Sequence, residues 1–451
     1  MKGSVGKEER TLKILWVKAG GLYPPNVGGR IRSYNILKGL ARRHSVTLFT
    51  FYAATPDDIH SQLECEFDRV VCVPLAIPSE RTFRGALRYG RHLLGRRPYT
   101  VAKFCQAGVA PRLRQLIATS KPDVIVCDFV FAAETIPWNT PLPKVLFTHN
   151  VETSIWQQHY TLARNPLWKI MCWREYKTMQ WFERCCINRA DHVLTVSAQD
   201  QSVFSEMIDS SRITVIPTGV DVNYFRPSSE PPQPNTLVFS GAMDWLPNED
   251  GVQYFVKQIL PLIRKQMSNV SLCVVGRSPS RRLLALGADH PNVHVTGCVD
   301  DVRPYVQSAS VYVVPLRIGG GTRLKIFEAM AMGKAIVSTS IGAEGLPVQP
   351  GIDIMIADKP EEFARATVHL LEDHNRREAL GRAARELVVH GHSWEVVAQD
   401  FERVLEKCIS VGKATAGKIE LEAPTLSLSC DNPSGLRGPS VSLRFPNNNA
   451  L

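Results

Sequence analysis

A glycine-rich turn followed by cations and an acid is the part of this chain whose residue types could do chemistry. The segment VVPLRIGGGTRLKIFEAMAMGKAIVST joins an apolar strand to an amphipathic helix. The turn between them consists of Gly319, Gly320 and Gly321, and Thr322 stands at the N-cap position of the helix. Glycine lets the backbone approach a ligand closely, and the free N–H groups at a helix start bind anions. This junction is therefore a candidate phosphate site.

The charged residues of the same junction strengthen that interpretation. Arg323 and Lys325 lie in the first helical turn, where positive charge opposes the helix macrodipole, so an anionic ligand would remove the conflict. Glu328 follows three residues after Lys325. It could form a surface ion pair with Lys325, or it could accept two hydrogen bonds from a ribose diol. Because glycines, cations and acid cluster at one junction, we favour a nucleotide diphosphate site.

Two further positions in the first half of the chain are candidates for a ligand cleft. The first apolar strand runs into GGLYPPNVGGR, and a helix is expected to begin near Gly28 and Gly29. This turn could hold an anion or be a plain turn, and the dinucleotide fingerprint GxGxxG is absent from it. His149 and Asn150 follow another strand end. A single histidine there could face a cleft, or it could be a packing or capping residue.

The elements that must position these residues alternate along the chain. Apolar runs separated by helical patterns predict two doubly wound α/β domains with parallel sheets that face a cleft. The first domain is placed at 12–216, a proline-rich hinge at 217–235 and the second domain at 236–392. The remaining segments are a flexible N-terminus at 1–11, a helix at 393–410 that crosses back to the first domain, and a disordered tail at 411–451.

The chain has 451 residues and a formal net charge of +10, and this charge is concentrated. Residues 81–114 carry nine cations and no acid. Four of them recur at helical spacing above an apolar strip: Arg81, Arg84, Arg88 and Arg91. Such a helix could bind an anionic membrane surface or an acidic acceptor, or it could be a solvated face over a core stripe. Nucleic acid is not expected, because no DNA-binding motif or interleaved aromatic residues accompany the arginines.

Membrane-spanning and metal-binding classes are not indicated. No apolar run reaches the roughly 18 residues that a membrane span needs. The N-terminus lacks the apolar core of a secretory signal. The 11 cysteines include no CxxC pair. We therefore expect a cytoplasmic protein, bound at most to the surface of the cytoplasmic membrane.

With these segments in view, the chain from about Leu12 to Cys408 resembles the retaining glycosyltransferases of family 4, also called glycosyl transferases group 1. The matching segments are PPNVGGRIRSYNILKGLARRHSVTLFTF, FTHNVET, ITVIPTGVDVNYFRP and GGGTRLKIFEAMAMG. The last of these looks like a variant of bacterial polysaccharide-type members. The resemblance implies the GT-B fold, in which two Rossmann-like domains face a cleft, the first on the acceptor side and the second binding the nucleotide sugar.

The resemblance also assigns roles to the candidate residues. Glu328 matches the second acid of the family's Glu-x7-Glu pair, which binds the donor ribose, and Gly320 occupies the position of the first acid. The family's usual diphosphate-binding Arg and Lys are missing, since GAMDWLPNEDG stands at 241–251. Arg323 and Lys325 are the expected replacements, with Arg32 reaching from the other domain. His149 is expected beside the donor sugar.

The expected function is transfer of a sugar, with retained anomeric configuration, from a nucleotide diphosphate sugar to an acceptor hydroxyl. The acceptor would be a carbohydrate or a lipid-linked molecule in polysaccharide or glycolipid assembly. No DxD motif is present, so we expect neither a metal nor a cofactor besides the donor. Two alternatives stay open: a sugar-nucleotide epimerase of the same fold, and a nucleotide-sugar-binding protein without turnover.

Overall fold

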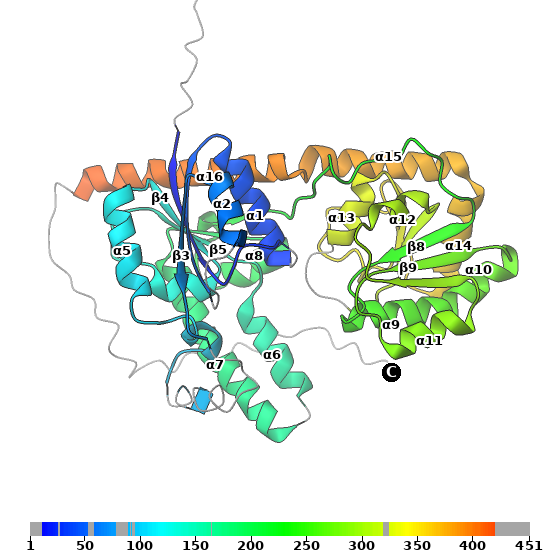
Figure 1. The fold of residues 1–451 in the computed structure, drawn as a ribbon, viewed down its shortest axis with the longest axis horizontal. Coiled ribbons are helices and arrows are strands. Elements are labelled where there is room, and N and C mark those ends of the chain that lie inside the picture. The colour runs from blue at the N-terminus through cyan, green and yellow to red at the C-terminus, as the bar shows by residue number, and fades with distance from the viewer. Residues whose placement is uncertain are drawn as a thin grey trace, which may run out of the picture.

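Two α/β lobes stand side by side in the protein (Figure 1). The computed structural model describes residues 11–25, 28–52, 58–77, 89–90, 92, 95–163, 165–318 and 324–419. Each lobe is built on its own parallel sheet, one of seven strands and one of six. The prediction of two doubly wound parallel-sheet domains is therefore confirmed.

The N-terminal sheet has the strand order β3-β2-β1-β4-β5-β6-β7. Its strands are β1 (Lys13–Ala19), β2 (Ser45–Tyr52), β3 (Arg69–Pro74), β4 (Val124–Asp128), β5 (Lys144–Phe147), β6 (His192–Thr195) and β7 (Ile213–Val215). The order reverses between β1 and β4, which pair in a register that sets Lys18 opposite Asp128. In doubly wound sheets, ligands bind outside the carboxyl ends of strands at such a reversal.

The C-terminal sheet repeats this plan with the order β10-β9-β8-β11-β12-β13. Its strands are β8 (Thr236–Ser240), β9 (Ser271–Val275), β10 (Val293–Gly297), β11 (Val311–Val314), β12 (Ala335–Ser338) and β13 (Met355–Ile356). The order reverses between β8 and β11. The two-residue edge strand β13 is too short to show a period of apolar residues, and the sequence pattern does not predict it.

Helices cover both sheets. In the N-terminal domain they are α1 (Gly28–Ala41), α2 (Asp58–Glu66), α4 (Tyr99–Ala102), α5 (Val109–Ser120), η1 (Val130–Thr135), α6 (Glu152–Leu162), α7 (Pro166–Arg189), α8 (Ala198–Ser205) and η2 (Ser210–Arg212). In the C-terminal domain they are α9 (Leu246–Tyr254), η3 (Phe255–Ile259), α10 (Leu260–Gln266), α11 (Arg281–Asp289), α12 (Arg303–Ser308), α13 (Leu324–Ala331), α14 (Pro360–Glu372) and α15 (His374–Gly391). Side-chain caps mark several helix starts, for example Asn165, whose Oδ1 accepts from the N–H of Trp168 at 3.1 Å.

The chain crosses between the domains twice, and the two crossings touch. Val220 donates its N–H to the carbonyl of His392 at 2.7 Å, and Trp394 donates to the carbonyl of Val220 at 3.3 Å. Gly219 lies against the indole of Trp394, where a Cβ would come within 2.4 Å of the ring. Only glycine fits at this position, and its absence of a side chain lets the two crossing segments pack against each other.

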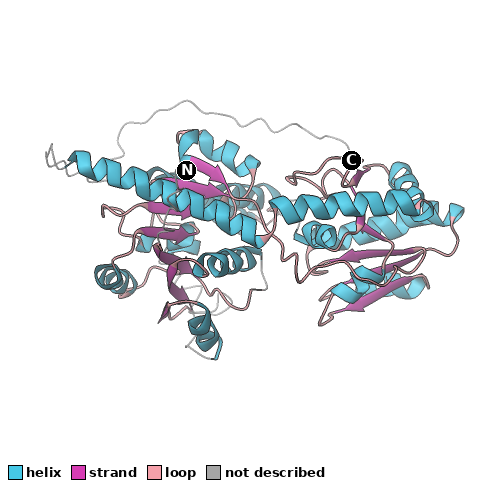
Figure 2. Cartoon of the chain, turned by 90° about the horizontal axis from the view of Figure 1, so that it is seen from above, coloured by secondary structure: helices cyan, strands magenta, loops and turns pink. Residues whose placement is uncertain are grey.

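The last helix, α16 (Trp394–Ile419), lies along the N-terminal domain and is the long helix beside the N label in Figure 2. Its apolar face buries Val397, Phe401 and Leu405 in the core on one face of the N-terminal sheet. Phe401 lies 5.3 Å from the rings of both Trp16 and Phe147. The helix ends at Ile419, beyond the predicted end at 410.

Some sequence expectations lie outside the described residues. These are the tail from 420 onward, residues 1–10, and the four arginines of the basic stretch, Arg81, Arg84, Arg88 and Arg91. Among the residues that are described, no helix combines the length and apolar character required to cross a bilayer.

Candidate functional site

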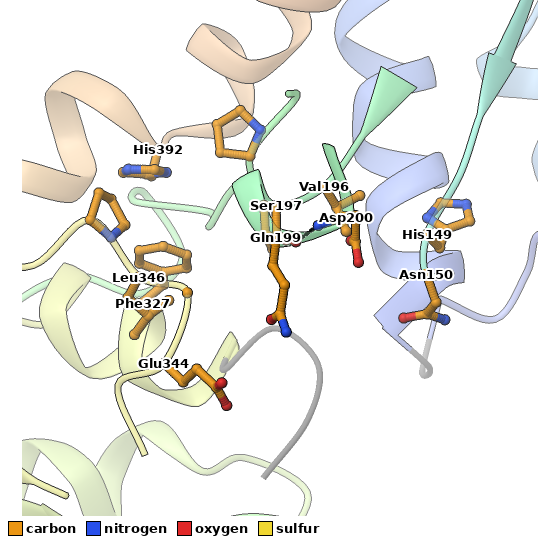
Figure 3. A pocket seen from close by; sticks show the side chains of 14 residues that line it. His149, Asn150, Val196, Ser197, Gln199, Asp200, Phe327, Glu344, Leu346 and His392 are labelled. Carbon is orange, nitrogen blue, oxygen red and sulfur yellow. Dashed lines mark hydrogen bonds between the residues drawn. The ribbon is translucent and has the colours of Figure 1, made fainter. Parts of the chain in front are cut away.

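A pocket lies between the two domains (Figure 3). Its wall on the N-terminal side includes His149, Asn150, Ser197, Asp200 and Thr218, and its wall on the C-terminal side includes Phe327, Glu344, Leu346 and His392. The N-terminal residues follow the carboxyl ends of β5, β6 and β7. In the C-terminal wall, Phe327 comes after β11, Glu344 and Leu346 come after β12, and His392 comes directly after α15. The carboxyl edges of both sheets therefore face one cleft, the arrangement expected of a ligand site.

A buried charge cluster stands at the carboxyl edge of the N-terminal sheet. Asp128, at the end of β4, is fully buried, and its Oδ2 accepts from Lys18 Nζ and from Trp16 Nε1, both at 2.8 Å. Its Oδ1 accepts from His149 Nε2 at 2.7 Å. Burial alone would raise the pKa of Asp128, but Lys18 and His149 outweigh this effect and hold it well below its ordinary value. The carboxylate is therefore ionised and satisfied.

The imidazole of His149 has both ring nitrogens engaged. Nδ1 lies 3.1 Å from Nη1 of Arg32, a group that can only donate, so Nδ1 is the acceptor and the proton is on Nε2, facing Asp128. Burial lowers the pKa of His149 to about 4, against the opposing effect of Asp128. The ring is therefore neutral near pH 7, with its nitrogens turned toward Arg32 and Asp128.

Arg32 connects this cluster to the hinge. Its Nη2 and Nε donate to the hydroxyl of Thr218 at 2.6 and 3.2 Å. Only 4% of the residue is exposed, and burial lowers the pKa of its guanidinium to about 10. Arg32 therefore contacts Thr218 and His149, at strand ends whose position the sequence does not reveal. Its expected reach from the first domain toward a diphosphate stays a prediction.

The first glycine turn and Asn150 lie close to this cluster. Gly28 and Gly29 begin α1, and a Cβ on Gly29 would lie 3.8 Å from the ring of His149. Asn150, the residue after His149, lines the pocket. The fold therefore brings the first-domain candidates Gly29, Arg32, His149 and Asn150 together.

In the C-terminal domain, Lys325 points toward the carboxyl end of β8. Its Nζ donates to Asn248 Oδ1 at 2.7 Å and lies 4.1 Å from the centre of the Phe239 ring. A Cβ on Gly241 would lie 2.8 Å from the same Nζ. The ammonium is thus held beside the segment 241–251, which replaces the family's usual cationic segment. The sequence interpretation made Lys325 a replacement for the cations expected in that segment, and this role stays a prediction.

Glu328 lies one helical turn further along α13 and contrasts with Asp128. It is partly buried, and within the described part of the chain its carboxylate receives no hydrogen bond and forms no ion pair. Burial raises its pKa from 4.5 to about 7, although Lys325 opposes the shift. A desolvated carboxylate that receives no hydrogen bond from the described residues can accept from hydroxyl groups of a ligand.

The glycine turn itself cannot be compared with the expectation. Gly319, Gly320, Gly321, Thr322 and Arg323 lie outside the described residues. Lys325 and Glu328 also stand apart from the pocket lining found among described residues, which includes their neighbour Phe327. The structure therefore shows two adjoining groups of candidates, one in the pocket and one on α13.

Sequence reasoning missed several residues of this region. In the sequence, Lys18 and Asp128 are only charged residues that interrupt apolar runs, and Asn248 belongs to the segment 241–251, for which no role was assigned. His392 had no signal. Its ring stacks on Phe327 with 4.7 Å between ring centres, and its buried Nδ1 has no partner in the described structure.

Within the described residues, no group of three or more His, Cys, Asp or Glu side chains could hold a metal ion.

Family comparisons agree with this arrangement. The family model described as Glycosyltransferase Family 4 matches residues 28–224, and the one described as Glycosyl transferases group 1 matches residues 234–373. The two matched ranges correspond to the two domains that form the cleft.

Individual relatives are more distant. An uncharacterised glycosyltransferase of Methanocaldococcus jannaschii is 24% identical over 49% of this chain and 60% of its own length. A phosphatidyl-myo-inositol mannosyltransferase of Mycolicibacterium smegmatis is 28% identical over 44% of this chain and 52% of its own. Anabaena HepE, solved in complex with UDP, has a TM-score of 0.61 at 16% identity and covers 88% of this chain and all of its own. The chain thus spans little more than half the length of these two curated relatives, and the solved structure supports the fold.

Proposed function

This chain belongs to the glycosyltransferases of group 1 and Family 4, and from that premise we propose that it transfers a sugar from a nucleotide diphosphate donor to an acceptor hydroxyl with retained configuration. The observation that carries the proposal is the pair on α13: the ammonium of Lys325, positioned by Asn248, and the carboxylate of Glu328, which lacks a donor in the described structure. A nucleotide diphosphate sugar offers a partner to each group, namely a phosphate to the ammonium and a ribose diol to the carboxylate.

The donor is proposed to bind across the start of α13. The diphosphate would lie against Lys325 and the glycine turn, where helix N–H groups and a cation offset its charge. The ribose hydroxyls would donate to Glu328. These hydrogen bonds favour the ionised carboxylate, so binding the donor would lower the pKa of Glu328 from about 7.

The chemical step is proposed as a same-face displacement. Departure of the diphosphate leaves oxocarbenium character on the sugar and negative charge on the phosphate, and Lys325 stabilises that charge. A phosphate oxygen of the leaving group would take the proton of the acceptor hydroxyl. The contacts of His149 support this scheme, because they leave the imidazole unable to act as the base for the acceptor hydroxyl. Its Nδ1 accepts a hydrogen bond from Arg32, and its Nε2 donates its proton in a hydrogen bond to Asp128. Metal independence and the absence of other cofactors remain part of the proposal.

The acceptor is proposed to be a carbohydrate or a lipid-linked molecule, with the enzyme on the cytoplasmic face of a membrane. The similarity to the Mycolicibacterium phosphatidyl-myo-inositol mannosyltransferase supports a lipid-linked acceptor. The basic stretch with Arg81, Arg84, Arg88 and Arg91 supports an anionic surface, since each cation near such a leaflet adds about 1 kcal/mol of attraction.

The test is donor turnover with the full chain. Nucleoside diphosphate release is measured across a panel of nucleotide sugars, with and without candidate acceptors. Release that rises with acceptor supports transfer. Isomerised donor without acceptor would point to an epimerase, and donor binding without any turnover to a binding protein.

Two variants tie the activity to α13. Glu328→Gln and Lys325→Met should impair donor use. The matched controls Glu362→Gln and Lys359→Met remove an exposed ion pair of the same domain and should not. Equal activity of all four variants would contradict the site assignment.

A further inference from the structure

The helices α6 and α7 form a hairpin that projects beyond the body of the N-terminal domain, on the side away from α16 (Figure 1). We define the outer hairpin as residues 162–163 and 165–184, which comprise the described part of the tip and most of α7. The base of the hairpin is fixed: Glu183 of α7 accepts from the N–H groups of Glu152 and Thr153 at 2.9 and 3.1 Å, and so caps the start of α6. The projection is therefore a firmly attached part of the domain.

Large apolar side chains are exposed on this projection. Leu162, Leu167 and Ile170 at the tip are 77%, 74% and 63% exposed. Three tryptophans accompany them with about half of their surface exposed: Trp168, Trp173 and Trp181. A cluster of this size on a soluble surface marks a place where something apolar binds.

On α7 these residues form a continuous stripe. Ile170, Trp173, Lys177, Trp181 and Arg184 are spaced by three or four residues and are all exposed, so they lie on one helical face. The opposite face is buried and carries the ordinary core contacts of the domain. The stripe is therefore a second apolar face, directed outward and mixed with cations.

The acidic side chains of the hairpin are buried, whereas its exposed charged side chains are basic. Its three acids, Glu152, Glu175 and Glu183, are all buried. They act inside the fold: Glu183 caps α6, and Glu175 accepts the N–H of Tyr99 at 2.8 Å. Every charged side chain exposed on the described part of the hairpin is cationic, namely Lys169, Lys177, Arg184 and Arg189.

We propose that the outer hairpin docks on an anionic phospholipid leaflet. Leu162, Leu167 and Ile170 would enter the acyl boundary and the tryptophans would lie at the headgroup level. The cations would meet lipid phosphates. Apolar insertion combined with cations that attract anionic lipid is the chemistry of interfacial helices. A second copy of the chain fits less well, because self-pairing of this face would bring its cations against each other.

The position of the hairpin connects this surface to the pocket. Asn150 lines the pocket and α6 begins two residues later, at Glu152. The 11 residues of α6 span about 16 Å at 1.5 Å per residue, so a docked tip would hold the pocket near the leaflet. Arg174 of α7 also binds the carbonyls of Gly95 and Arg97, directly after the basic stretch in the chain. This deepens the proposed function, because it rests on a lipid-linked acceptor, while docking itself requires no turnover.

The experiment is co-sedimentation of the full chain with sucrose-loaded vesicles of phosphatidylglycerol and phosphatidylcholine in equal parts. An apolar variant carries Leu162→Ser, Leu167→Ser and Ile170→Ser, and a charge variant carries Lys169→Glu, Lys177→Glu and Arg184→Glu. Each should lower the partition coefficient at least about tenfold, and binding of the unaltered chain should weaken with salt. Pure phosphatidylcholine should bind the chain weakly.

Control variants remove other exposed residues, from the C-terminal domain. Leu284→Ser with Ile352→Ser controls for lost apolar surface, and Lys257→Glu with Lys265→Glu controls for reversed charge. Both should bind as the unaltered chain does. Thermal unfolding verifies that each variant is folded, and quenching by brominated lipid should decrease when Trp168 and Trp173 are changed to Phe.

Three outcomes would overturn the proposal. The first is that both hairpin variants bind anionic vesicles as strongly as the unaltered chain does. This includes the case in which vesicle binding is lost only when Arg81, Arg84, Arg88 and Arg91 are changed to Gln. The second is no binding of the unaltered chain to anionic vesicles. The third is a dimer without vesicles that the apolar variant dissolves, which would make this face an interface between copies. Donor turnover is measured separately, so its failure is distinguishable from failure of docking.

Discussion

The two domains hold their buried charges in opposite ways. In the N-terminal domain, Asp128 receives hydrogen bonds from Lys18, Trp16 and His149, and its pKa lies well below the ordinary value. In the C-terminal domain, Glu328 has no hydrogen-bond donor among the described residues, and its pKa rises to about 7. The Asp128 carboxylate is satisfied by its neighbours, whereas the Glu328 carboxylate receives no hydrogen bond from the described residues.

We propose that this difference separates a structural carboxylate from one that binds a ligand. A completed ion pair in a buried site is strongly destabilising to break, because the remaining partner is left uncompensated. An incomplete one costs stability in the free protein and becomes favourable when a ligand completes it. Removing the two carboxylates should therefore have opposite effects on folding, and this contrast can be tested.

The largest expected effect is on the N-terminal cluster. Asp128→Ala leaves the buried ammonium of Lys18 without its partner, and we expect the free energy of unfolding to fall by about 3 to 5 kcal/mol. Urea unfolding followed by circular dichroism measures it. The double variant Lys18→Met with Asp128→Leu should recover much of the loss, because no charge then remains buried. A double variant as unstable as the single one would show that the loss came from packing.

Next is the effect of Lys325 on turnover. Lys325→Ala should lower kcat by about 10²-fold, the size expected when one preorganised charge-stabilising donor is removed. The fold should be retained, since Lys325 is not part of the core. Initial rates of nucleoside diphosphate release, together with the thermal midpoint, give both quantities. Unchanged kcat would remove Lys325 from the diphosphate site.

Donor affinity should report on Glu328. Glu328→Ala should weaken donor binding by about 1 to 3 kcal/mol, the value of hydrogen bonds to a charged group. Because only the ionised carboxylate accepts from both hydroxyls, affinity of the unaltered chain should fall as the pH drops below about 7. Calorimetric titration across this range is the measurement. A variant that keeps both the affinity and its pH dependence would return Glu328 to a structural role.

The smallest expected effect is a gain of stability. Glu328 has its pKa raised from 4.5 to about 7, so the folded state binds more protons than the unfolded state in that window. The contribution of Glu328 to the protein's free energy of unfolding therefore decreases as the pH rises from 4.5 through 7. Glu328→Gln should stabilise the donor-free protein by about 1 kcal/mol at pH 8 and have no effect at pH 4. Destabilisation at pH 8 would contradict the comparison drawn above.

The fold was largely predictable because its signal is local. Strands such as β8 and β12 are short, apolar and bounded by polar residues, and their alternation with helices determines a doubly wound topology. The two-residue β13 was missed, since its pairing depends on the neighbouring β12 rather than on its own composition.

The site was predictable only where a motif is contiguous. Lys325 and Glu328 belong to one segment, and the structure places both on α13. The pairing of Lys18 with Asp128 depends on the register of β1 against β4, 110 residues apart in the chain. No sequence pattern encodes that register. For the same reason, the partners of Arg32 could not be inferred before the hinge and β5 were placed.

The route of α16 has a consequence for synthesis on the ribosome. One of the two cores of the N-terminal sheet includes Trp394, Phe401 and Ile409, and the Trp16 ring packs on Phe401. A nascent chain therefore makes the N-terminal domain first but lacks part of its interior until residue 409 has left the exit tunnel. The C-terminal sheet, whose core ends at Val388, can be complete before then. The core of the domain that is translated first thus depends on residues translated after the whole C-terminal sheet.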